Sequence, residues 1–253
     1  MSITIDQIKS LRDATSLSIS LCKQALEASN GDQEKAIEYL RKQGAMKAAK
    51  KADRATNEGV IAISIKNNKA GIMKLACETD FVAKNEAFRA FANSLAEKVL
   101  AGKTATDLKE ELNEQIMKIG ENLQIIEANV IEGPILNAYI HSTAKLAAII
   151  VLNKGNAELA KDLCMQVAAT NPQFIYPEDV SEDVLNKEKE IWKEQLKKEG
   201  KPEQIWDKIM MGKEKKFREE NSLVTQEFVK DSEKKIKDLL GDIKVEKMMR
   251  ITL

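Results

Sequence analysis

The sequence has few of the residues on which most active sites are built. Its only histidine is His141, and its three cysteines are widely separated, so no CxxC pair is present. A single histidine excludes a His-rich metal site and an ordinary multi-histidine acid/base centre. Isolated cysteines in odd number favour buried positions in a reducing compartment over a disulfide framework. We therefore expect no metal, no redox role and no enzyme activity.

Phosphate-binding loops and membrane segments are also lacking. There is no GxxxxGK[ST] loop and no GxGxxG after a strand, so the chain offers no nucleotide cradle or cofactor site of its own. No stretch approaches the roughly 20 apolar residues of a membrane span, and the start "MSITIDQIKS" is unlike a secretory signal. Basic and acidic residues both number 40, so nothing in the net charge favours nucleic acid or a membrane surface over a protein partner. We predict a cytoplasmic protein.

The beginning of the chain indicates a small helical domain. Apolar residues recur at helical spacing, "NGD" at 30–32 supplies a helix stop and a new N-cap, and a third helix is predicted to end at Gly44. We assign residues 1–45 to a three-helix N-terminal domain and residues 46–57 to a basic linker. The linker could be a contact strip for RNA or an acidic partner, but a solvated, partly helical segment is favoured because no aromatic residue is interleaved. Its basic residues are Lys47, Lys50, Lys51 and Arg54.

From residue 58 the hydrophobic pattern changes to period two. "GVIAISIKNNKAGIMKLACE" predicts two strands joined by a hairpin, followed by helices, including one near 106–118, and a closing strand in "ENLQIIEANVIE". The same strand-strand-helix-strand order recurs later in the chain. These patterns predict an α+β protein whose core has two subdomains with antiparallel sheets, 58–134 and 135–253.

A polar insertion interrupts the second subdomain at about 178–218. Two sparse apolar seams, one with Trp192 and one with Trp206, flank the turn "EGKPE" at 199–203. This pattern predicts an antiparallel coiled-coil hairpin, with both tryptophans in seam packing.

The stretch "CETDFVAKNEAF", residues 77–88, joins a predicted strand to a predicted helix and allows two interpretations. Phe81 lies one heptad before Phe88, so it could extend the core stripe of that helix, with Thr79 or Asp80 at the helix start. Alternatively, Asp80 and Phe81 form a protruding wedge for a partner, in which the aromatic ring supplies buried area and the carboxylate supplies orientation. The pattern alone leaves both open.

The longer stretch "CETDFVAKNEAFRAFA" closely resembles the signature of the bacterial elongation factor Ts family, whose Thr-Asp-Phe-Val is here Thr79 to Val82. The first helices resemble that family's ubiquitin-associated-like domain, although Ser16-Leu17-Ser18 replaces its usual Gly-Ala-Gly. Further matches occur in the right order along nearly the whole chain. They are "KIGEN" at 118–122, "PQFI" at 172–175, "PEDV" at 177–180, "GKPE" at 200–203 and "SLVTQEFVKD" at 222–231.

The resemblance implies a guanine nucleotide exchange factor in translation elongation. Such a protein binds elongation factor Tu with GDP, displaces GDP by disturbing the Mg²⁺ and phosphate site, and stabilises the nucleotide-free form. It binds no nucleotide directly. Two rival interpretations are a non-catalytic coiled-coil interaction scaffold and, last, a hydrolase that uses carboxylate pairs.

The resemblance also implies roles for residues of the wedge. Phe81 would press into the partner's G domain near Mg²⁺, and Asp80 would fix its orientation by polar contacts. Thr79 and Val82 would hold the shape of the corner and complete the partner-binding site.

Two further surfaces are implied by the same resemblance. The helical domain, around Leu11, Arg12 and Lys23, would dock on the G domain of elongation factor Tu. The second subdomain, including His141, would grip the partner's third domain, although a histidine without a partner contact is an equally good interpretation of His141.

Overall fold

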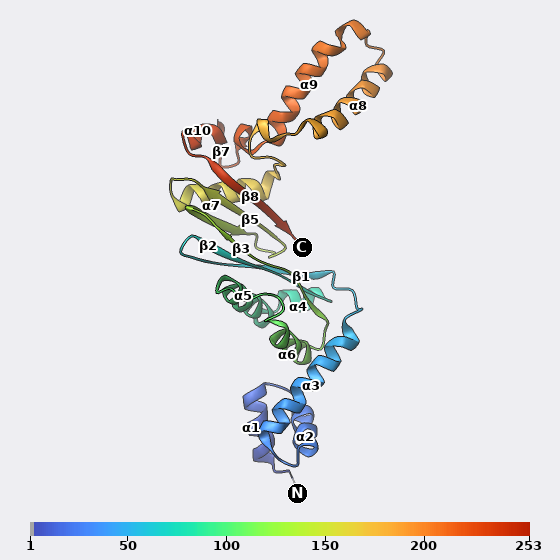
Figure 1. Ribbon diagram of the computed structural model, residues 1–253, viewed down its shortest axis with the longest axis vertical. Coiled ribbons are helices and arrows are strands. Elements are labelled where there is room, and N and C mark those ends of the chain that lie inside the picture. The colour runs from blue at the N-terminus through green and yellow to red at the C-terminus, as the bar shows by residue number, and fades with distance from the viewer. Residues whose placement is uncertain (1–2) are drawn as a thin grey trace. The chain divides into compact units, whose positions relative to one another are not determined.

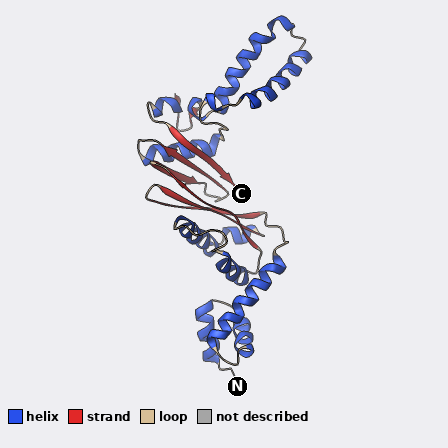
Figure 2. Cartoon of the chain, viewed as in Figure 1, coloured by secondary structure: helices blue, strands red, loops and turns tan. Residues whose placement is uncertain are grey.

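The computed structural model describes residues 3–253, which divide into two compact units. Unit 1 comprises residues 3–131, Ile140–Leu146 and Thr252–Leu253, and unit 2 comprises Glu132–Tyr139 and Ala147–Ile251. Each unit contains both helices and strands (Figure 2). The predicted α+β class is therefore confirmed. Among the described residues, no helix combines the length and the apolar character needed to cross a membrane.

Unit 1 begins with three helices, shown in blue in Figure 1. They are α1 (Ile5–Thr15), α2 (Ile19–Ala28) and α3 (Gln33–Lys51). The side chains of Thr4, Ser18 and Asp32 each accept a backbone N–H at a helix start, so every helix is capped locally. Ser16 ends α1 in the left-handed conformation, with φ 55°, which a non-glycine residue adopts at some cost.

The predicted end of the third helix at Gly44 is wrong. Helix α3 continues to Lys51, and Gly44 is buried in its interior against α6 (Lys109–Ile119). A Cβ atom on Gly44 would lie 2.7 Å from Sδ of Met117, so the missing side chain lets the two helices approach closely. A glycine can end a helix or let two helices approach closely, and Gly44 does the second. The first half of the predicted linker is helical, and the domain boundaries stay predictions.

The rest of unit 1 is a three-stranded antiparallel arrangement covered by helices. Its strands β1 (Glu58–Lys66), β2 (Lys69–Cys77) and β3 (Leu123–Glu132) lie in the order β1-β2-β3, and α4 (Asp80–Lys84) and α5 (Glu86–Leu100) follow β2. The β1–β2 hairpin is antiparallel, as the sequence predicts, and it turns through two residues with positive φ, Asn67 and Asn68. One face of this hairpin packs against α5, and the buried cluster includes Met73, Leu75 and Phe88.

Unit 2 is built around the sheet β4-β5-β8. Its elements are β4 (Ile135–Ile140), β5 (Leu146–Leu152), α7 (Ala157–Thr170), η1 (Pro177–Asp179), η3 (Leu223–Thr225), β6 (Glu227–Phe228), β7 (Asp231–Lys235), α10 (Ile236–Leu240) and β8 (Val245–Thr252). Strands β4 and β5, helix α7 and, after the inserted elements, strand β8 follow the predicted strand-strand-helix-strand order.

The predicted helical hairpin is present in unit 2 as α8 (Glu182–Lys198), η2 (Glu203–Ile205) and α9 (Trp206–Asn221) (Figure 1). Its packing is sparse: Trp192 meets Phe217 edge to face with ring centroids 5.8 Å apart, and Lys189 pairs with Glu214 at 2.8 Å. Ile191 of α8 is 52% exposed, whereas Leu185, Trp192 and Leu196 of the same helix are buried and form its seam.

Replacing Gly71 by alanine should destabilise the protein, because a Cβ there would lie 2.4 Å from the carbonyl oxygen of Ala96 in α5. We expect the free energy of unfolding to fall by about 1–3 kcal/mol, as for other overpacked sites. Urea denaturation followed by circular dichroism measures the change. The matched control is Gly212→Ala in α9, where a Cβ meets nothing and helix propensity favours alanine. Equal stability of both variants and the parent would contradict the close β2–α5 packing.

Candidate partner-binding site

Phe81 lies on a helix of its own. Strand β2 ends at Cys77, and Thr79 caps α4 by accepting the N–H of Val82 at 3.4 Å. Asn85 then ends α4 in an extended conformation and caps α5. Phe81 and Phe88 therefore belong to different helices, with exposed fractions of 82% and 1%. The interpretation of Phe81 as part of the core stripe is wrong, because the helix is interrupted at Asn85, between Phe81 and Phe88.

Asp80 stands beside Phe81 and forms an ion pair within the same helix. Its Oδ2 lies 2.7 Å from Nζ of Lys84, one turn further on. The hydrogen bond from Lys84 and the charge of Lys84 lower the pKa of the Asp80 carboxyl, and the same contact raises the pKa of Lys84. Both groups are charged at neutral pH, so a carboxylate and an exposed ring are presented side by side.

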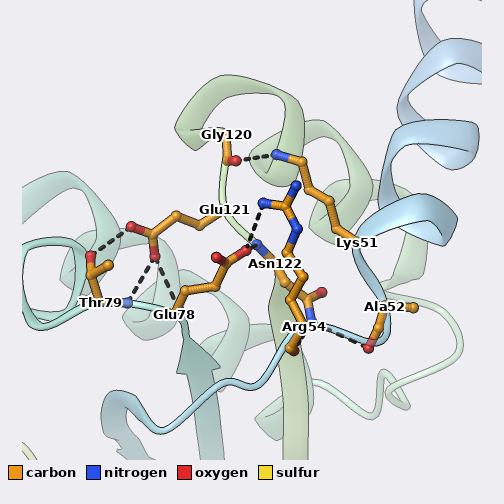
Figure 3. A network of polar contacts seen from close by, with 8 residues as sticks. All are labelled: Lys51, Ala52, Arg54, Glu78, Thr79, Gly120, Glu121 and Asn122. Carbon is orange, nitrogen blue, oxygen red and sulfur yellow. Dashed lines mark hydrogen bonds and ion pairs between the residues drawn. The ribbon is translucent and has the colours of Figure 1, made fainter.

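The chain segment before α4 is held by the side chain of Glu121 (Figure 3). One carboxylate oxygen accepts the backbone N–H groups of Glu78 and Thr79, both at 3.0 Å. The other accepts the hydroxyl of Thr79 at 2.6 Å. Three donors on one ionised acceptor form a strong, charge-assisted set. The corner that carries Phe81 is therefore fixed from a segment more than 40 residues away in sequence.

The loop that carries Glu121 is itself fixed from two sides (Figure 3). The backbone N–H of Asn122 donates to the Glu78 carboxylate at 2.6 Å, and its side-chain amide donates to the carbonyl of Arg54 at 2.9 Å. Lys51 donates to the carbonyl of Gly120. Two segments thus hold one another, since each supplies a glutamate that binds backbone N–H of the other.

Lys51 and Arg54 belong to this network, although the sequence suggested a solvated linker. Arg54 forms an ion pair with Glu78 at 3.4 Å. Burial, followed by the charge of Arg54, lowers the pKa of Lys51. Part of the basic segment therefore ties the end of α3 to the corner.

Cys77 lies under the same corner and packs as an apolar side chain. Burial, with a smaller effect from the charge of Glu121, raises the pKa of its thiol to about 12. The thiol donates to the carbonyl of Thr79 at 3.3 Å. It is protonated at neutral pH and therefore a poor nucleophile.

The predicted docking residues of the helical domain differ in their exposure. Arg12 and Lys23 are exposed on α1 and α2, and Lys23 lies 3.8 Å from Glu27. Leu11 was predicted to contact a partner, but its exposed fraction is 0%. This expectation is wrong, because Leu11 faces α2 and α3 and belongs to the core of the three-helix domain.

His141 is exposed in a turn that is attached to the start of β1. Its Nδ1 lies 3.0 Å from the Thr143 hydroxyl. The N–H of Ile61 donates to the carbonyl of Ala144 at 2.7 Å, and Lys145 pairs with Glu58 at 2.5 Å. Because Glu58 lies opposite Cys77 in the hairpin register, the turn and the Phe81 corner are at the same end of that hairpin.

Sequence reasoning missed the residues that hold the corner, namely Arg54, Glu78, Glu121 and Asn122. "KIGEN" at 118–122 was recognised as a family match, which was the available signal, but nothing in it indicated a contact with Thr79. Val82, in contrast, has the expected supporting place, because it is half-buried against the core cluster. Among residues 3–253, no group of three or more His, Cys, Asp or Glu side chains is arranged to hold a metal.

This geometry is that of an α+β protein with an exposed aromatic side chain on a corner held by several hydrogen bonds, and the comparisons with known proteins give its family. A family model described as Elongation factor TS matches residues 78–253. Elongation factor Ts of Teredinibacter turnerae (strain ATCC 39867 / T7901) is 45% identical over 245 residues, 92% of this chain and 84% of the relative. That of Psychromonas ingrahamii (strain DSM 17664 / CCUG 51855 / 37) is 43% identical over 267 residues, 100% of this chain and 90% of the relative.

The elongation factor Ts of Hahella chejuensis (strain KCTC 2396) is 42% identical over 247 residues, which cover 94% of this chain and 86% of the relative. The chain belongs to the elongation factor Ts family. Its role is therefore that of a translation elongation factor.

Replacing Lys84 by methionine should raise the pKa of the Asp80 carboxyl towards its ordinary value of 3.8, because the main cause of the lowered pKa is removed. A carboxyl whose pKa is lowered on folding stabilises the folded state fully at pH values above its pKa in the unfolded state. That stabilisation is lost as the pH falls through the lowered pKa of the folded state. Carbon-detected NMR titration of Asp80 measures the shift. The control is Lys74→Met on β2. An unchanged Asp80 pKa in Lys84→Met would show that this ion pair does not form in solution.

Proposed function

We propose that the chain is a guanine nucleotide exchange factor for elongation factor Tu. The observation that carries the proposal is the exposure of Phe81 on a helix whose start is held by the Glu121 carboxylate. A large apolar ring that is 82% exposed has no packing role in its own domain. Burying such a ring against a partner contributes about 1.5–3 kcal/mol.

The mechanism requires no nucleotide site on this chain. A GTPase holds GDP through phosphate-loop N–H groups, a lysine and Mg²⁺, so unassisted release is slow. A protein that binds the empty GTPase more tightly than the GDP-bound form must weaken GDP binding by the same factor. A coupling free energy of about 3 kcal/mol corresponds to a change of roughly 150-fold.

Phe81 acts as the apolar wedge in this proposal. It enters the partner's G domain near the groups that organise Mg²⁺ and the phosphates, and burial of the ring offsets the cost of displacing them. Asp80 orients the wedge through polar contacts, since its carboxylate is charged and half-exposed beside the ring. Thr79 faces Glu121 and Val82 faces the core, so these two residues support the wedge without touching the partner.

Docking of the helical domain rests on Arg12 and Lys23, which are exposed, and no longer on Leu11. His141 is exposed and held in a turn anchored on β1, which suits a contact with the partner's third domain. These surfaces supply affinity, while the wedge supplies the difference in affinity between empty and GDP-bound partner.

Phe81→Ala should slow GDP release by at least about tenfold, because loss of an interface anchor costs on the order of 2 kcal/mol. Stopped-flow release of a fluorescent GDP analogue from elongation factor Tu, over a range of concentrations of the chain, measures the rate. The fold should be unchanged by circular dichroism, because Phe81 makes little packing contact.

The matched control is Ile65→Ala, which removes another exposed apolar side chain at the opposite end of the β1–β2 hairpin. It should leave release unchanged. Parent-like rates for Phe81→Ala would exclude the wedge. An unmutated chain that binds elongation factor Tu without accelerating GDP release would instead support the scaffold interpretation.

A further inference from the structure

We propose that Glu121 is a positioning residue for nucleotide exchange, because its carboxylate keeps the Phe81 corner in the conformation that can enter a partner. This inference rests on the proposed function and adds a residue that would touch neither GDP nor the wedge's target. Its basis is the hydrogen-bond set of Figure 3.

The backbone at the corner needs an acceptor from outside its own strand. The β1–β2 ladder ends at the pair Glu58 and Cys77, so the N–H groups of Glu78 and Thr79 lie beyond it. The Oε2 atom of Glu121 accepts both at 3.0 Å. Backbone donors that are partly buried without an acceptor are costly, so this single carboxylate fixes where the chain turns away from the sheet.

A relay of hydrogen bonds continues from Glu121 into the helix of the wedge. The Thr79 hydroxyl donates to Oε1 of Glu121 at 2.6 Å, and the same hydroxyl oxygen accepts the N–H of Val82 at 3.4 Å. Donation to the carboxylate orients the hydroxyl so that a lone pair faces Val82. Glu121 therefore sets the N-cap, and the N-cap sets the direction of α4.

Helix α4 cannot keep that direction unaided. It has five residues, fewer than an isolated helix needs to be stable, and Phe81 contributes almost no packing. Only Ala83 is buried within it. The supports of the wedge are therefore the clamp at its start, the packing of Ala83 and Val82, and the hydrogen bond from Nε of Arg89 in α5 to the carbonyl of Ala83 at 3.1 Å.

The clamp is itself held by further hydrogen bonds, unlike an isolated surface contact. Asn122, next to Glu121, is buried, and its N–H donates to the Glu78 carboxylate at 2.6 Å. Because Asn122 follows Glu121 directly, the backbone at Glu121 cannot shift away from the corner without breaking the bond from Asn122 to Glu78. Preorganisation of this kind reduces the ordering cost that a flexible tip would meet on insertion.

The test compares Glu121→Ala, Glu121→Gln, Phe81→Ala and the double variant of Glu121→Ala with Phe81→Ala in the GDP-release assay. We expect Glu121→Ala to lower the release rate at saturating chain by about tenfold or more, as displacement of a positioned group does. The half-saturating concentration should change little, because Arg12 and Lys23 are untouched. Arg12→Ala should show the opposite split, with a raised half-saturating concentration.

The conservative variant and the double variant identify the cause. Glutamine keeps one oxygen for the N–H groups of Glu78 and Thr79 but places an amide NH₂ near the Thr79 hydroxyl, so Glu121→Gln should be intermediate. The double variant should release GDP no more slowly than Phe81→Ala alone, because a clamp without a wedge has nothing to position. Additive losses would overturn the proposal. Glu97→Ala, on the exposed face of α5, controls for loss of one negative charge.

Amide hydrogen exchange of the isolated chain tests the clamp without elongation factor Tu. Glu121→Ala should accelerate exchange at Glu78, Thr79 and Val82 and leave the amides of β1 unchanged. Unchanged protection at the corner would overturn the clamp whether or not the chain is an exchange factor. Accelerated exchange, together with no effect of the unmutated chain on GDP release, would preserve the clamp and refute the proposed function, so the two failures are distinguishable.

Discussion

The corner of unit 1 that carries Phe81 depends on one carboxylate, which accepts three hydrogen bonds from a turn more than 40 residues away in sequence. Glu121 holds Glu78 and Thr79 where β2 ends, and the short helix that follows starts from that point. Without a fixed start, a five-residue helix carrying an exposed ring would have little to define its direction. In turn, the backbone N–H of Asn122 and the side chain of Arg54 bind the Glu78 carboxylate, so the segment around Glu78 and the segment around Glu121 are fixed together.

This arrangement explains how one exposed aromatic side chain is compatible with a stable domain. The core below it is complete without Phe81, since Phe88, Met73 and Leu75 fill the space between α5 and the hairpin. The backbone N–H groups of Glu78 and Thr79 and the Thr79 hydroxyl all donate to Glu121 in the same unit. A side chain can be exposed for contact with another protein when its removal leaves the packing of its own domain intact.

Local patterns predicted most of the fold, whereas the exposed site residues Asp80 and Phe81 were assigned a role only through the family resemblance. Alternation located the β1–β2 hairpin, and helical spacing located α5 and the helical hairpin. Gly44 was misassigned because the sequence alone does not distinguish a glycine that ends a helix from a glycine that leaves room for a side chain of another helix, here Met117. Leu11 was misassigned because the resemblance implied a docking role for the region around Leu11, Arg12 and Lys23 together, whereas Leu11 is buried and the other two are exposed. Pairing of Glu121 with Thr79 spans 42 positions, so no local pattern could indicate it.

Helix α3 also sets a distance and an angle between the two ends of unit 1. It runs without interruption over 19 residues, from the core of the three-helix domain to Lys51 beside Gly120. At 1.5 Å per residue it spans about 28 Å, and each added residue would turn one end by about 100° relative to the other. Insertions or deletions in α3 would therefore rotate the three-helix domain about the helix axis and also change its distance from the corner. The length of α3 is thus as constrained as its composition.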